Sequence, residues 1–163
     1  MSEDNIEQAL KMMPYGFFSI TSKAGDDVNA MVANWVTQSS FEPRQVAFAL
    51  QKTSYTHGLI ENGGVFAINL FRSEDVDYLK PFTKGREKNP DKMEDAKFEP
   101  APQTGCPMLE GAAAVVECKL VELIDTGGDH DLVVAEVVGA QVFEEADAGD
   151  ILTLSDLGWS YAG

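Results

Sequence analysis

The chain has 163 residues, 44% of them hydrophobic, and a formal net charge of −15. This length suits a single domain over residues 1–163, and the apolar content excludes disorder of the chain as a whole. The acidic balance argues against nucleic-acid binding, which needs a basic surface. We also expect a cytoplasmic protein, because no apolar run approaches the roughly 18 residues of a membrane span and the N-terminus lacks a secretory signal.

The elements expected in chain order are mostly strands. Apolar residues at helical spacing predict a helix over residues 5–13, which Pro14 ends. Strands are predicted at 15–21, 28–36, 45–50, 65–71, 112–124 and 132–144. Two more helices are predicted, one from Thr53 or Ser54 to about residue 61 and one over 74–82, where apolar residues recur at i, i+3 and i+6.

The connections favour an antiparallel arrangement. Residues 23–27 and 126–131 are hairpin turns by composition, and the strands on either side of each would pair. The chain is therefore expected to be mainly β, with about six strands and two or three short helices in an antiparallel barrel, since closure removes exposed edges. Residues 83–107 have weak periodicity, and a loop of this length is more often functional than idle.

The segment KTSYTH, residues 52–57, begins the second predicted helix with several hydrogen-bonding groups. A helix N-terminus presents free N–H groups and a partial positive charge, which together suit an anion. Candidate ligands of a phosphate group are Lys52, Thr53, Ser54 and Thr56. An ordinary N-cap at Ser54 is the alternative interpretation of the same residues.

The segment ANWVTQSS, residues 33–40, ends the second predicted strand and runs into a serine-rich turn. A planar heterocycle such as an isoalloxazine needs donors and acceptors along one edge and apolar contact on its face. The side chains of Asn34, Thr37, Ser39 and Ser40 could hydrogen-bond such an edge. The alternative is a strand that leads into a turn, with Trp35 in the core.

Two further features leave alternatives open. Residues 80–97 hold six of the twelve basic residues, either as a solvated loop or as a positive patch for a phosphorylated ligand. His130 lies in a predicted turn, where a histidine is usually a solvent-exposed bystander. Its neighbours match no metal-ligand spacing, so no metal site is predicted. HExxH, Walker and GxGxxG patterns are absent, and Cys106 and Cys118 are expected to be free thiols in a reducing compartment.

Taken in order, several segments resemble the flavin reductase-like family of FMN-binding split-barrel proteins. The matching segments are PYGFFSITS (14–22), NAMVANWVTQSSFEP (29–43), VAFALQKTSYTHGLIENGGVFAINLF (46–71), GCPMLEGAAAVVECKL (105–120), GGDHDLVVAEVV (127–138) and LGWSYAG (157–163). The resemblance implies a six-stranded Greek-key split barrel that works as a homodimer and binds FMN, sometimes FAD. Arg44 stands where a second proline is common, and residues 83–100 are unusually charged, which puts the second substrate in doubt.

The resemblance also implies roles for single residues. Asn34, Trp35, Val36 and Thr37 would line the isoalloxazine, and Ser39 and Ser40 would continue that wall. Lys52, Ser54 and Thr56 would hold the phosphate, joined by Lys84, and His130 would lie near the nicotinamide. The function expected is NAD(P)H-dependent flavin reduction. The alternatives are an FMN protein that passes electrons to a partner such as a rubredoxin, and a small barrel that binds another ligand or only dimerises.

Overall fold

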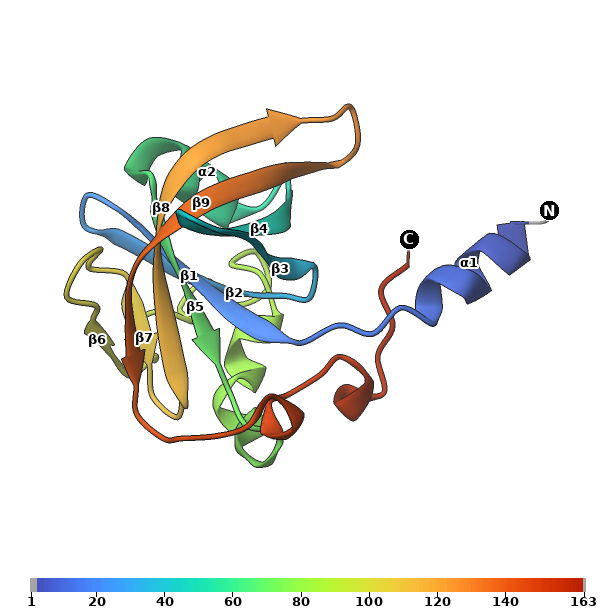
Figure 1. Cartoon of the computed structure of the whole chain (residues 1–163). Coiled ribbons are helices and arrows are strands. Elements are labelled where there is room, and N and C mark those ends of the chain that lie inside the picture. Colours follow the sequence, from blue (N-terminus) through green and yellow to red (C-terminus); the bar gives the residue numbers. More distant parts are fainter. Residues whose placement is uncertain (1–2, 163) are drawn as a thin grey trace.

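A computed structural model describes residues 3–162 and shows a mainly β protein (Figure 1). The helical elements are α1 (Glu3–Lys11), α2 (Tyr55–Gly63) and four short 3₁₀ helices, η1 (Ser73–Tyr78), η2 (Lys80–Thr83), η3 (Ala148–Asp150) and η4 (Ser155–Leu157). The strands are β1 (Phe18–Ala24), β2 (Asp27–Ala33), β3 (Val36–Phe41), β4 (Arg44–Gln51), β5 (Val65–Leu70), β6 (Phe98–Pro100), β7 (Pro107–Leu109), β8 (Ala114–Asp125) and β9 (His130–Val142).

Seven strands form one antiparallel sheet, in the order β2-β1-β5-β8-β9-β4-β3, and β6 and β7 pair separately. The expected β-rich fold is confirmed, although the main sheet has seven strands where six were predicted. Its two edge strands, β2 and β3, are consecutive in sequence and are separated only by Asn34 and Trp35. Two residues can bridge no more than about 11 Å, so the sheet must curl until the end of β2 lies near the start of β3 (Figure 1).

The curled sheet carries a hydrophobic cluster on each face. On β5, Phe66 and Ile68 belong to one cluster while Ala67 belongs to the other, as the alternation of side chains in a strand requires. The first cluster also contains Phe48 and Leu50 of β4. The second is covered by side chains from η1–η2, from β7 and from the C-terminal segment, such as Phe82, Leu109 and Leu152. The long connections after β5 therefore complete the core.

Three predicted elements differ in the structure. Residues 74–82, predicted as one helix, lie in two 3₁₀ helices, η1 and η2, with Leu79 between them. The serine-rich segment expected as a turn is the edge strand β3, with a register shift between Gln38 and Ser40. The predicted loop 83–107 contains β6 and the start of β7.

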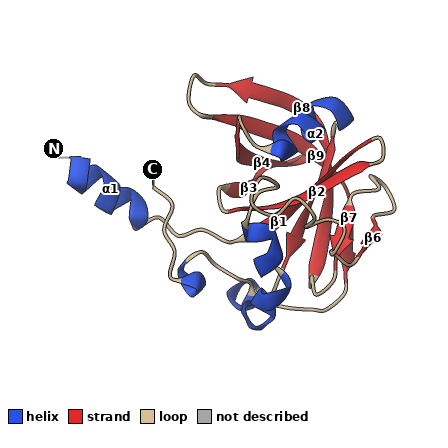
Figure 2. Cartoon of the chain, turned by 180° about the vertical axis from the view of Figure 1, so that it is seen from behind, coloured by secondary structure: helices blue, strands red, loops and turns tan. Residues whose placement is uncertain are grey.

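The two ends of the described chain lie beside each other, away from the main sheet. The helix α1 extends outward in both views, and the C-terminal segment ends near it (Figures 1 and 2). That segment is tied to the body by isolated bridges, which join Thr153 to Gly16 and Ile151 to Arg72. Between residues 3 and 162, no helix is both long enough and apolar enough to cross a membrane.

Candidate functional site

A cavity of about 560 Å³ lies where the N-terminus of α2 faces β2 and the loop after η2. Its lining includes Asn29, Met31, Val32, Gln51, Thr53, Ser54, Tyr55, Thr56, Phe82 and Thr83, together with the basic residues Lys84, Arg86, Lys88 and Lys92. The helix begins here because the Ser54 Oγ accepts a hydrogen bond from the backbone N of His57 at 3.2 Å. The volume falls within the range of about 300–1,000 Å³ that is usual for small-molecule sites.

Four residues predicted to hold a phosphate, Thr53, Ser54, Thr56 and Lys84, line this one cavity. Thr56 is fully buried, and its Oγ1 accepts a hydrogen bond from the Asn29 Nδ2 at 2.9 Å. Ser54 combines its capping bond with a second one, in which its hydroxyl donates to the Gln51 carbonyl at 2.8 Å. The turn that begins α2 is thereby fixed against β2 and the end of β4.

The basic residues of the loop give this cavity its charge. Arg86 donates from Nε to the Asn29 Oδ1 at 3.1 Å and from a terminal nitrogen to Asp27 at 3.3 Å. Its guanidinium carbon also lies 4.1 Å from the centre of the Tyr55 ring, a cation–π contact. Four of the six basic residues in 80–97 line the cavity, so the positive-patch interpretation describes this segment better than a solvated loop.

Lys92 is the most unusual of the four, because it is only 3% exposed. Its ammonium donates to the carbonyl of Lys84 at 3.2 Å. Burial and, to a smaller extent, the charge of Arg86 together lower the pKa of Lys92 from 10.5 to about 8. The sequence shows a cluster of similar lysines and gives no signal that this one is buried.

A second group of predicted residues surrounds Trp35, at the break between β2 and β3. The Trp35 ring lies 5.0 Å from the ring of His130 and 4.6 Å from that of Tyr161, measured between centres. The His130 Nε2 and the Tyr161 hydroxyl are 3.3 Å apart, and the His130 Nδ1 is 2.7 Å from Asp129. Trp35 and His130, far apart in sequence, are thus brought together, and among the described residues neither hydrophobic cluster includes Trp35.

Asn34 connects the two groups. It follows β2, whose residues Met31 and Val32 line the cavity, and it directly precedes Trp35. The side chain is 6% exposed, and its Nδ2 has no hydrogen-bond partner in the described part of the chain. A buried amide donor without a partner is costly, so it is a candidate for bonding a ligand.

The remaining predicted residues lie elsewhere. Val36, Thr37, Ser39 and Ser40 belong to the edge strand β3 and do not line the cavity. Lys52 does not line it either, because its ammonium pairs with Asp125 at 2.7 Å and lies 3.9 Å from Asp131. The hydrogen bond to Asp125 raises the pKa of Lys52. These contacts hold the end of β4 to the β8–β9 hairpin.

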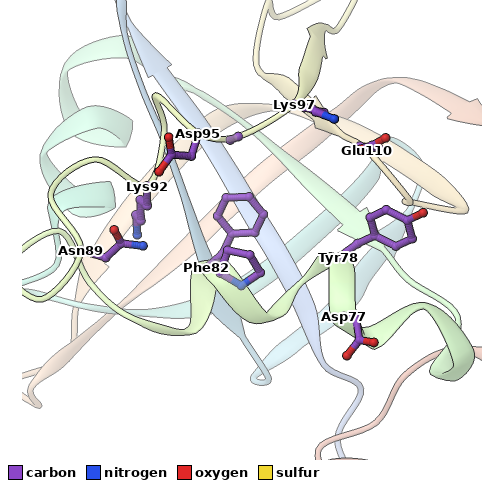
Figure 3. Close-up of a pocket in the computed structure, with 10 residues that line it drawn as sticks. Asp77, Tyr78, Phe82, Asn89, Lys92, Asp95, Lys97 and Glu110 are labelled. Carbon is purple, nitrogen blue, oxygen red and sulfur yellow. The ribbon is translucent and has the colours of Figure 1, made fainter.

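A second cavity of about 400 Å³ is lined by residues from η1, η2 and the segment that follows them (Figure 3). The two share Lys92 and Phe82. Its other lining residues include Tyr78, Ala96, Asn89 and the carboxylates Asp77, Asp95 and Glu110. No group of three or more His, Cys, Asp or Glu side chains in residues 3–162 could hold a metal ion.

The structure therefore defines a class of protein in which a curled antiparallel sheet carries a cavity suited to an anion at a helix N-terminus. Residues 10–158 match the model of the flavin reductase like domain, so the chain belongs to the flavin reductase-like family. The family resemblance of the sequence is therefore confirmed.

Similar proteins include a ferric-chelate reductase (NAD(P)H) of Archaeoglobus fulgidus, 28% identical over 151 residues, which are 91% of this chain and 86% of that protein. A Nostoc protein named diflavin flavoprotein A 3 is 33% identical over 143 residues, or 85% of this chain. The chain spans only 24% of that relative's length. Among solved structures, the FMN-binding protein of Thermus thermophilus, with bound 1-cyclohex-2-enone, is 25% identical with a TM-score of 0.71, covering 82% of this chain and 73% of that one.

Proposed function

We propose that this chain binds a flavin nucleotide, FMN or FAD, and is an NAD(P)H-dependent flavin oxidoreductase that works as a homodimer. The observation that carries the proposal is the cavity at the start of α2, where Ser54 and Thr56 face four basic side chains. A helix N-terminus, hydroxyl groups and cations together suit a phosphate. The unpartnered Nδ2 of Asn34, just beyond the β2 wall of that cavity, supplies a donor for a polar ring edge.

The residues of the chain would divide the work between binding and positioning. Ser54, Thr56 and the basic loop would hold the phosphate, and Asn34 would donate to the flavin ring. His130, held between Asp129 and Tyr161, would orient the nicotinamide or carry a proton. When bound, a flavin supplies a hydride acceptor at its N5 atom, so the protein contributes orientation and exclusion of water.

The first experiment is a spectrum of the purified protein followed by titration with FMN, FAD and riboflavin, read by flavin fluorescence. We expect quenching by all three, with riboflavin weaker because it lacks the phosphate. A colourless protein that quenches none of them would reject the flavin site. Size-exclusion chromatography with light scattering tests the homodimer, and a monomeric mass would contradict it.

The second experiment is anaerobic stopped-flow mixing of the flavin-loaded protein with NADH and with NADPH. Bleaching of the flavin absorbance supports the reductase. Negligible bleaching with either nucleotide would instead support electron relay to a redox partner. We expect His130→Ala to slow NAD(P)H oxidation more than it weakens FMN binding, and Thr126→Ala, an exposed change in the same hairpin turn, to alter neither. An equal loss, or none, in both measurements would remove His130 from this role.

A further inference from the structure

The two cavities share lining residues from one segment of the chain. Phe82 and Lys92 line both of them, and the loop between these residues supplies Lys84, Arg86 and Lys88 to the first cavity. Figure 3 shows Lys92 and Asn89 at one end of the second cavity, Phe82 in the middle, and Tyr78 and Asp77 at the other end. A ligand longer than the first cavity would therefore pass Lys92 before it enters the second.

Lys92 occupies this position without a counter-charge. No ion pair of Lys92 is found in the described residues, and its one hydrogen bond goes to a backbone carbonyl. A buried ammonium without a paired carboxylate costs free energy, and the charge of Arg86, which has the same sign, lowers the pKa of Lys92 further. An anionic group between the two cavities would remove that cost.

The end of the second cavity that lies away from Lys92, near Tyr78, differs in its chemistry from the basic first cavity. Asp77 and Glu110 line that end together with Lys97, whereas Asp95 lies beside Lys92 (Figure 3). The two carboxylates can accept hydrogen bonds from hydroxyl and amino groups. The Tyr78 ring is 47% exposed and rests directly against Gly111, where an added Cβ would lie 2.3 Å from its Cγ. An exposed ring held in this way offers a stacking surface for a planar base.

We propose that the two cavities form one bipartite site for a dinucleotide, with its diphosphate at Lys92 and its adenosine in the second cavity. The inference rests on the proposed flavin site, which would take the other half. Ribose hydroxyls and the amino group of adenine would donate to the carboxylates, and the base would stack on Tyr78.

Blocking the second cavity tests this assignment. Ala96 lines only that cavity, so Ala96→Phe should fill it without touching the first. In isothermal titration, we expect the Kd of FAD to rise at least tenfold while that of FMN stays within twofold, and binding of ADP alone to be lost. Glu94→Gln, an exposed change in the same segment that lines neither cavity, should leave all three unchanged.

The adenosine diphosphate group could come from FAD or from NADH, and separate measurements distinguish them. A rise in the Kd of FAD assigns the second cavity to the flavin dinucleotide. A rise in the KM of NADH, measured with FMN-loaded protein, assigns it to the nicotinamide dinucleotide. If neither value moves in Ala96→Phe or in the smaller change Tyr78→Ala, the bipartite site is wrong. Failure of FMN itself to bind the unmodified protein would instead reject the proposed function.

Discussion

Replacing Lys92 with methionine should stabilise the ligand-free protein. The side chain is 3% exposed, and its pKa is lowered from 10.5 to about 8. At pH 7 Lys92 stays charged in the folded protein, and a lowering of its pKa by this amount reduces the free energy of unfolding by about 3 kcal/mol. Methionine fills a similar volume, and the lost hydrogen bond to the Lys84 carbonyl costs about 1 kcal/mol. The net gain is about 2 kcal/mol, or a rise in Tm of about 4–8 °C for a chain of this size.

The pH dependence of this gain identifies its cause. Between pH 8 and 10.5 the unfolded state binds more protons at Lys92 than the folded state, so the stability of the unmodified protein rises with pH through that window. The advantage of Lys92→Met should therefore fall to nearly zero at about pH 9.5. Thermal unfolding followed by circular dichroism at both pH values measures it, with Lys97→Met as an exposed control. A loss of Tm at pH 7, or a gain that does not depend on pH, would refute the reasoning.

Three further predictions concern separate features. Ser54→Ala removes the N-cap of α2 and should lower the free energy of unfolding by about 1 kcal/mol in urea titration, whereas no change would mean that the cap is not formed in solution. Gly111→Ala should cost about 1–3 kcal/mol in the same assay, because φ is +89° there, while Gly128→Ala, with open space around it, should cost less than half as much. Burial raises the pKa of Cys106 to about 11 and that of Cys118 to about 12, so neither thiol should react with Ellman's reagent at pH 8 until urea unfolds the chain; fast labelling of the folded protein would contradict this.

The strands of the core were predictable because burial leaves a periodic trace in their sequences. β4 alternates partly, yet its run of apolar residues around Phe48 is a strand signal even without alternation. β3 could not be found in this way. Thr37, Gln38 and Ser39 are all exposed, so neither face of that edge strand is marked by apolar residues. Pairing with β4, a tertiary interaction, makes it a strand.

The helical structure predicted from the apolar spacing of segment 74–82 is correct, although the prediction did not specify the type of helix. Val76, Leu79 and Phe82 recur every third residue, which is the period of a 3₁₀ helix and not the 3.6 of an α-helix. The structure has two such helices there, and Leu79 and Phe82 are buried. The spacing of the apolar residues therefore indicates the type of helix as well as its presence.

For the site, local chemistry could be predicted but the pairing of distant groups could not. Ser54 and Thr56 signal an anion site through helix capping, which depends on neighbouring residues alone. Lys52 lies in the same segment and was predicted by the same local chemistry, yet its ammonium bonds to Asp125, more than 70 residues away in sequence. The burial of Lys92 is decided in the same way by the packing of distant segments, which no local pattern records.

The charge of the whole chain and the charge of the cavity act over different ranges. A net charge of −15 would repel a nucleotide from the surface, but at about 0.1 M salt such interactions are screened beyond about 10 Å. Inside the cavity, Arg86 and the buried Lys92 act at short range and in a medium of lower dielectric, where screening is weak. Added salt should therefore raise the association rate constant of an anionic ligand by a larger factor than it raises the dissociation rate constant. The net charge argues against binding of nucleic acid, which needs an extended basic surface, but it does not argue against binding of a small phosphorylated ligand.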